Sequence, residues 1–125
     1  MATYSKEFFT GSATDEGGTG IALPVDSGSF ITIHTTTTTA ATLDEIWMYA
    51  VNSHSADLKV TIQFGGVEEP EDYIETTVTA ESGLVLIVPG LILQGKASTG
   101  LIVKGAAATG DEVAVYGYVN RIAAS

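Results

Sequence analysis

The strongest constraint on the fold is a strict alternation of side chains between positions 58 and 64. Apolar residues occupy every second position, and polar residues stand between them: Leu58, Val60, Ile62 and Phe64 against Lys59, Thr61 and Gln63. Successive side chains of a β-strand point to opposite faces of its sheet, so this period predicts a strand with one buried face. We expect the four apolar residues to face the core and their polar neighbours to be more exposed.

Seven further segments have the composition of strands, and turns rich in glycine separate most of them. They are residues 30–34, 46–51, 74–80, 84–88, 91–93, 101–103 and 112–122. About eight short strands with regular turn signals are typical of a sandwich, a jelly roll or a small barrel. The sequence therefore predicts an all-β fold, which we expect to be an antiparallel β-sandwich of the jelly-roll kind.

One of these segments has a second interpretation. Residues 42–45 read Thr-Leu-Asp-Glu, which matches a helix capping box ahead of the apolar run 46–51. That run is short, aromatic and β-branched, and a turn-like sequence follows it. We expect a strand that forms a hairpin with residues 58–64, and a short helix is the alternative.

The chain of 125 residues is long enough for one domain, and its beginning differs from the rest. Residues 11–20 are polar and rich in glycine, whereas Tyr4, Phe8 and Phe9 ahead of them are apolar. Residues 1–20 are therefore expected to be an N-terminal arm or an edge segment, followed by a single β-sandwich domain over residues 21–125. If they form an arm, the three aromatic residues are candidate interface anchors.

Charge and cysteine content exclude several classes of function. Five Lys and Arg against fifteen Asp and Glu give a formal net charge of −10, so we expect neither nucleic-acid binding nor attachment to an anionic membrane. No apolar run reaches the ~20 residues of a membrane-spanning helix, and the first residues do not resemble a secretory signal. The absence of cysteine excludes disulfides, thiolate catalysis and zinc-ribbon sites.

The nearest match to a chemical motif is the run of residues 90–96, which spells the beginning of a phosphate-binding loop, G-x-x-x-x-G-K. Ala97 stands where the motif needs a magnesium-binding hydroxyl. The interior of the run is Leu-Ile-Leu, which suits a strand, and no helix is expected to follow. We interpret the segment as a strand between two turns.

The histidines do not form an expected catalytic or metal site. His34 has no His-x-His partner, and His54 lies in a turn with Ser53 and Asp57, which are too close in sequence for a nucleophile, a base and an orienting acid. The acidic run 68–72 could bind calcium, but it lacks EF-hand spacing and is more typical of a solvated loop. We expect no enzyme activity, no cofactor and no metal.

Two tyrosines near the end of the chain share one face of the last expected strand. Tyr116 and Tyr118 are separated by one residue, and valines occupy the other face. Such a pair could stack on a sugar, contact another subunit or simply pack within the sheet.

Five segments carry a resemblance to a known group of proteins. They are residues 44–52, 60–66, 72–78, 82–90 and 115–122, and together they span about residues 43–122. In order and pattern they resemble small all-β virion proteins of tailed bacteriophages, of the kind that decorate or cement capsids. This resemblance implies a protein of the capsid surface in the virion, often a homotrimer, whose partner is the major capsid protein.

The expected function follows from this resemblance. A decoration protein binds the outer surface of the assembled head and stabilises contacts between capsomers, through many weak contacts repeated by symmetry. The alternatives are a carbohydrate- or receptor-binding β module and a tail, neck or fibre subunit of the virion. We also expect residues 1–20 to be mobile in the free chain and to become ordered on the capsid.

Overall fold

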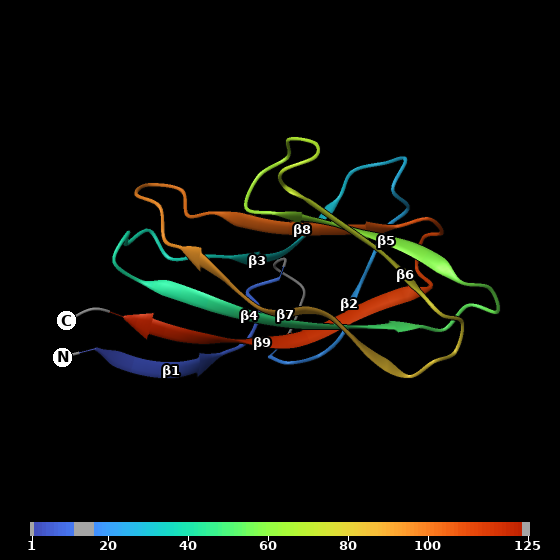
Figure 1. The fold of residues 1–125 in the computed structure, drawn as a ribbon, viewed down its shortest axis with the longest axis horizontal. Coiled ribbons are helices and arrows are strands. Elements are labelled where there is room, and N and C mark those ends of the chain that lie inside the picture. The colour runs from blue at the N-terminus through green and yellow to red at the C-terminus, as the bar shows by residue number, and fades with distance from the viewer. Residues whose placement is uncertain (1, 12–16, 124–125) are drawn as a thin grey trace.

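The computed structural model of the protein describes residues 2–11 and 17–123, which form two antiparallel sheets packed face to face (Figure 1). This confirms the predicted all-β sandwich. The described residues contain no helix, and therefore none that could cross a membrane. The strands are β1 (Thr3–Glu7), β2 (Ile21–Ala22), β3 (Ile31–Thr35), β4 (Leu43–Asn52), β5 (Leu58–Phe64), β6 (Tyr73–Val78), β7 (Leu84–Gln94), β8 (Ile102–Ala107) and β9 (Val113–Ala123).

The strand pairing is nested. One sheet has the order β1-β9-β4-β7, with β2 also paired to β9, and the other has the order β3-β8-β5-β6. Strand β5 pairs with β6, and around this hairpin β4 pairs with β7, β3 with β8 and β2 with β9, all antiparallel. A long hairpin rolled over itself in this way is a jelly roll, as expected from the sequence.

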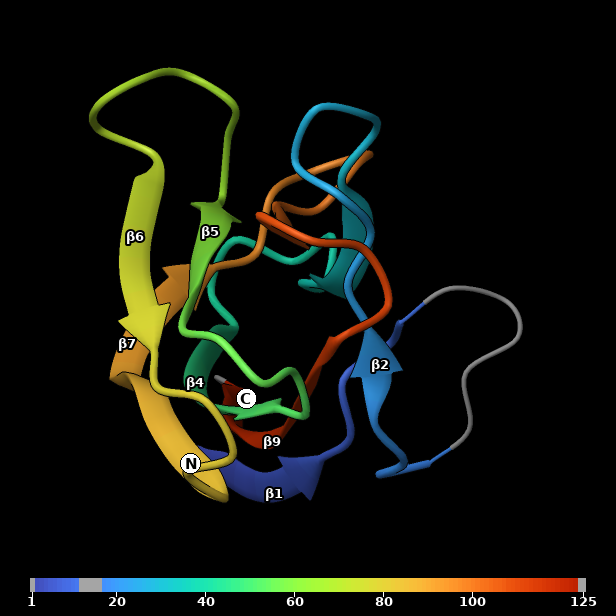
Figure 2. The ribbon, with the colours of Figure 1, turned by 90° about the vertical axis from the view of Figure 1, so that its right-hand side faces the viewer.

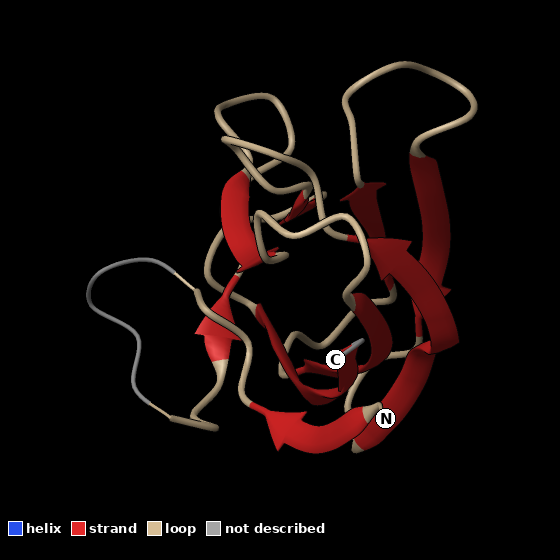
Figure 3. Cartoon of the chain, turned by 90° about the vertical axis from the view of Figure 1, so that its left-hand side faces the viewer, coloured by secondary structure: helices blue, strands red, loops and turns tan. Residues whose placement is uncertain are grey.

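Strand β1 lies outside this nest and extends one edge of the five-stranded sheet. It pairs with the last residues of β9, from Val119 to Ala123, while β2 pairs with Val115 and Ala114 of the same strand. The two strands therefore follow each other along one side of β9, and both ends of the described chain lie side by side (Figure 3). Residues 12–16 of the polar, glycine-rich stretch lie outside the described residues.

The core lies between the two sheets and consists of aliphatic side chains from both. Fully buried members come from strands of the five-stranded sheet, from strands of the four-stranded sheet and from the segment after β2: Leu23, Ile33, Ile46, Met48, Val60, Ile62, Val88, Val103, Val115 and Val119. Burial of each such side chain stabilises the fold by about 1.5–3 kcal/mol before the cost of ordering the chain is counted.

The alternation in β5 assigns both faces of the strand correctly but overestimates the exposure of the outer one. Leu58, Val60 and Ile62 are buried and Lys59 is exposed, as expected, but Thr61 and Gln63 are only 3% and 8% exposed. Strand β5 is interior to its sheet, and Gln63 is further covered by Tyr73, to whose hydroxyl its Nε2 donates a hydrogen bond of 3.2 Å. Polar residues on the outward face of an interior strand can therefore be buried without facing the core.

Two further expectations concern neighbouring strands of the five-stranded sheet. Residues 43–52 form strand β4 and not the alternative helix, but the expected hairpin with residues 58–64 is wrong. Strand β4 pairs with β7 and β9, and β5 lies in the other sheet, because the nested pairing places β4 and β7 around the β5–β6 hairpin. The expected pair of strands at 84–88 and 91–93 is a single strand, β7, because Pro89 and Gly90 form an irregularity in its register and not a turn. Gly90 has a φ of +80°, and a Cβ there would lie 2.8 Å from the ring of Trp47, so the bulge requires glycine.

Candidate interaction surface

The outer face of the five-stranded sheet follows from the burial pattern of its central strand. In β4 the residues Asp44, Ile46, Met48 and Ala50 are buried, so the alternate residues point away from the core. These outward residues include Trp47 and Tyr49. The register then fixes their neighbours, because each outward residue faces another on the next strand.

Cross-strand pairs make this outer face aromatic and apolar. Tyr118 of β9 lies opposite Trp47, Tyr116 lies opposite Tyr49, and Leu86 of β7 flanks Tyr49 on the other side. We call the apolar residues of this surface the aromatic face: Tyr4, Leu43, Trp47, Tyr49, Val51, Leu84, Leu86, Ile92, Tyr116, Tyr118 and Ile122.

The aromatic face exposes a large area of apolar side chain. Tyr4 is 73% exposed, Leu84 58% and Ile92 53%. Four strand widths of about 4.8 Å and about ten residues at 3.3 Å each give the face an extent of about 600 Å². Contiguous apolar patches of this size on a single chain mark interaction surfaces, since water covers them poorly.

Charge is nearly absent from the aromatic face, although the chain carries fifteen acidic residues. Glu45 accepts hydrogen bonds from Asn120 Nδ2 at 3.0 Å and from Trp47 Nε1 at 2.7 Å, and these two bonds lower the pKa of Glu45. The Lys6 ammonium lies 4.6 Å from the centre of the Tyr118 ring, which is a cation–π distance. Both charged side chains are thus tied to aromatic residues of the face.

The backbone edge of this sheet is less available than its side chains. Strand β7 ends the sheet order, so one side of it has no partner strand among the described residues. Its register with β4 shifts twice, between Ile46 and Trp47 and between Met48 and Tyr49, and Pro89 lacks an N–H. Bulges and proline prevent another strand from pairing along an edge. A partner would therefore contact the side chains of the aromatic face and not extend the sheet.

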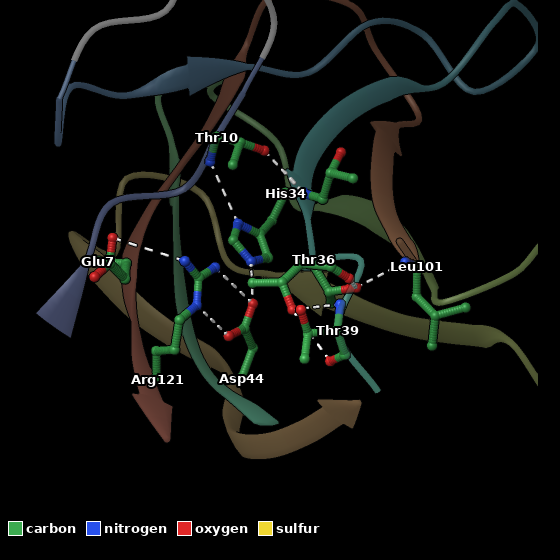
Figure 4. A network of polar contacts seen from close by, with 10 residues as sticks. Glu7, Thr10, His34, Thr36, Thr39, Asp44, Leu101 and Arg121 are labelled. Carbon is green, nitrogen blue, oxygen red and sulfur yellow. Dashed lines mark hydrogen bonds and ion pairs between the residues drawn. The ribbon is translucent and has the colours of Figure 1, made fainter. Parts of the chain in front are cut away.

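A buried polar network lies behind the sheet, between β3, β4 and β9 (Figure 4). Asp44 accepts a 2.8 Å hydrogen bond from His34 Nε2 and two more from Arg121, with Nε at 2.8 Å and Nη2 at 3.0 Å. His34 and Asp44 are fully buried, and Arg121 Nη1 also lies 3.9 Å from Glu7 of β1. The network joins both sheets and the first strand.

The network favours the ionised form of Asp44. Burial raises the pKa of Asp44, but the hydrogen bonds that it accepts from His34 and Arg121, together with the charge of Arg121, outweigh burial and bring the pKa to about 2. His34 Nδ1 accepts the Thr10 backbone N–H at 3.3 Å, so the ring hydrogen must be on Nε2, which donates to Asp44. The arrangement anchors residues 7–10 and offers no nucleophile to a substrate.

The residues that sequence reasoning considered for a catalytic triad instead shape a turn. Asn52 Oδ1 accepts the backbone N–H of His54, His54 Nδ1 accepts that of Ala56, and Asp57 accepts that of Ala80. These bonds hold the β4–β5 connection. Ser53, His54 and Asp57 therefore lie in one turn region, but the side chains of His54 and Asp57 accept hydrogen bonds from the backbone.

The other motif residues have structural positions as well. Residues 90–94 of the G-x-x-x-x-G-K run belong to strand β7, and Lys96 lines a shallow hollow of about 230 Å³ together with Lys104. In the acidic run 68–72, Asp72 accepts the backbone N–H of Glu68 at 3.0 Å. Within the part of the chain that the structure describes, no group of three His, Asp or Glu side chains could hold a metal ion.

The three N-terminal aromatic residues have different environments. Tyr4 and Phe8 are exposed, whereas Phe9 packs against the core with its ring centre 5.9 Å from that of His34. Tyr4 belongs to the aromatic face, because it pairs with Ile122. Phe9 is instead part of the connection between β1 and the sandwich.

Sequence reasoning singled out Tyr116 and Tyr118 of the aromatic face but not Trp47, Tyr49 or Leu86. The alternation of residues along β4 could have identified Trp47 and Tyr49 as outward, but the capping-box pattern at residues 42–45 left a helix open there. Comparison with known protein families and with curated proteins finds no match to this chain.

Proposed function

We propose that the protein is a bacteriophage capsid decoration protein. It binds the outer surface of the assembled head, in the virion, and stabilises contacts between capsomers. Its partner is the major capsid protein, and it acts as a homotrimer. The sequence resemblance to small all-β virion proteins supports this proposal, and the antiparallel all-β fold agrees with it.

The observation that carries the proposal is the aromatic face. An acidic chain with a largely apolar sheet face about 600 Å² in planar extent has a surface suited to an apolar patch on another protein. Aromatic side chains dominate the energy of such contacts, because each buries a large area at a small entropy cost. The face also lacks the row of charges that would oppose its desolvation.

The acidic residues complement this arrangement. Apart from Glu45, those that the structure describes lie in loops, on the other sheet or in the buried network, for example Asp57, Glu75 and Glu112. A chain attached through its aromatic face presents these carboxylates to solvent. The resulting negative layer keeps particles apart.

The mechanism is avidity. Each contact of about 600 Å² per chain is modest compared with the ~800 Å² per partner of a standard stable interface. Three linked chains that bind three symmetry-related sites gain effective concentration with no new contact. A trimer across neighbouring capsomers therefore opposes their separation more strongly than three separate chains.

The test begins with purified phage particles. Quantitative mass spectrometry should find the protein on the order of hundreds of copies per particle, as repeated shell sites require. Purified protein added to shells that lack it should bind them and raise the temperature at which they release DNA. A few copies per particle would instead identify a tail, neck or fibre subunit, and light scattering on the free protein tests the trimer.

A further inference from the structure

The outer face of the four-stranded sheet contains a polar hollow of about 330 Å³, on the side of the sandwich away from the aromatic face. Strand β5 contributes Lys59 and Thr61 to it, and strand β6 contributes Tyr73 and Glu75. Lys59 Nζ and the Glu75 carboxylate are 3.1 Å apart, and both side chains are about half exposed. The hollow therefore has a fixed pair of hydrogen-bond donor and acceptor on one side.

Two loops complete the walls of the hollow. The segment between β2 and β3 supplies Asp26 and Phe30, and the β5–β6 loop supplies Glu69. Both loops extend at the top of the molecule in Figure 2. The rings of Phe30 and Tyr73 lie 6.5 Å apart with a tilt of 42°, which gives the hollow an apolar surface beside its polar groups.

Thr61 provides the strongest sign that the hollow receives a ligand. The residue is only 3% exposed, yet its hydroxyl makes no hydrogen bond to any residue within 2–11 or 17–123. The hydroxyl is also not sealed from solvent, so it opens onto the hollow that the residue lines. A polar group in so buried a residue ordinarily has a partner.

We propose that this hollow binds a neutral, hydroxyl-rich ligand, of which a glycan is the natural example. A sugar ring carries hydroxyls that both donate and accept, which matches the ammonium of Lys59, the carboxylate of Glu75 and the hydroxyl of Thr61. Its C–H surface packs against aromatic rings such as those of Phe30 and Tyr73. The volume is at the small end of ligand sites.

Charge distinguishes this ligand from others of similar size. An anion would approach the three carboxylates of Asp26, Glu69 and Glu75. The hydrogen bond that Lys59 donates to Glu75, together with the charges of these carboxylates, raises the pKa of Lys59. A cation would compete with Lys59 for Glu75. A neutral polyol disturbs neither the ion pair nor the net charge, so it fits the hollow as it stands. The free protein would bind this ligand, and the binding does not depend on attachment to a capsid.

The experiment uses the full-length protein and an array of immobilised neutral saccharides, followed by titration calorimetry with the best binder. We expect at least one neutral saccharide to bind, with an affinity that changes less than about twofold between low and high salt, because neutral ligands are not screened. Arginine amide serves as the competing cationic probe. The proposal is overturned if no saccharide binds, or if only the cation binds and its affinity depends strongly on salt.

Two variants and a matched control locate the site. Thr61→Val removes the hydroxyl but keeps the branched shape, and it should weaken saccharide binding about fivefold, the value of one hydrogen bond. Phe30→Ala should weaken it about tenfold through loss of the ring surface. Tyr116→Ala, on the opposite face, should bind as the unchanged protein does. Equal affinity of all three variants overturns the assignment, and thermal melting confirms that each is folded.

Discussion

The outer faces of the two sheets arise from the same alternation of side chains and yet expose different chemistry. On β4 and β9 the outward positions hold Trp47, Tyr49, Tyr116 and Tyr118. On the four-stranded sheet the outward positions of β5 hold polar residues, and two loops with carboxylates line a hollow above them. The comparison teaches that period two identifies the outward positions, whereas the residue types at these positions decide what the face can bind.

The largest loss of unfolding free energy is expected from a substitution on the inner side of β4, compared with a substitution on its outer side. Asp44→Ala leaves Arg121 and His34 without their buried partner, and it should lower the free energy of unfolding by about 3–5 kcal/mol. The adjacent outward residue offers the matched control, since Glu45→Gln keeps an acceptor for Trp47 and Asn120. Urea denaturation measures both variants. Equal losses of unfolding free energy in the two variants would show that both sides of β4 contribute alike to stability.

The unfolding free energy should also depend on pH through Asp44 of the buried network. Asp44 has a pKa of about 2 in the folded protein against 3.8 as its ordinary value, so folding favours the ionised carboxylate. Its contribution of about 2 kcal/mol is fully present above pH 4 and is lost as the pH falls from about 4 to about 2. Unfolding free energies at several pH values should show this loss in the unchanged protein and not in Asp44→Asn. A parallel pH dependence of both would contradict it.

A charge placed on the aromatic face should weaken binding to capsid shells without unfolding the chain. Leu86→Lys introduces an ammonium into the proposed contact, and binding to capsid shells should weaken about tenfold or more. Because Leu86 is exposed, the melting temperature should change little.

The control for this variant is Thr77→Lys, at an exposed outward position of β6. Shell binding by Thr77→Lys should equal that of the unchanged protein in a sedimentation assay. If both lysine variants bind alike, the aromatic face does not contact the shell.

The smallest effect is expected from the ion pair on the four-stranded sheet. Lys59→Gln removes one half of an exposed pair with Glu75, which water and salt already screen. The melting temperature should therefore remain unchanged, in contrast to the result for Asp44. A clear fall in the melting temperature would show that this pair contributes to stability as the buried network does.

Local patterns predicted the fold class well because strands, turns and their period are properties of neighbouring residues. The jelly roll, the buried face of β5 and the shared face of Tyr116 and Tyr118 all follow from such patterns. The division of residues 84–94 into two strands was wrong, since a Pro-Gly pair forms either a turn or a bulge, and the cross-strand partner Trp47 decides which.

The network and the hollow could not be predicted from the sequence. His34, Asp44 and Arg121 are separated by up to 77 residues, and only the nested pairing brings them together. Thr61 gives no sign in the sequence of lining a hollow, because Asp26 and Phe30, which line it as well, come from the distant segment between β2 and β3. Contacts of this kind depend on topology, which periodicity does not specify.

The nested pairing has a consequence for synthesis on the ribosome. Only the β5–β6 hairpin joins strands that follow each other directly, while β2 and β4 must wait for β9 to emerge before the five-stranded sheet can close. Partners so far apart in the chain pair slowly, because a large loop must close before the contacts form. Until then the apolar strands β4 and β7 would be open to neighbouring nascent chains. Production in quantity therefore favours conditions that slow aggregation, such as low temperature or chaperone excess.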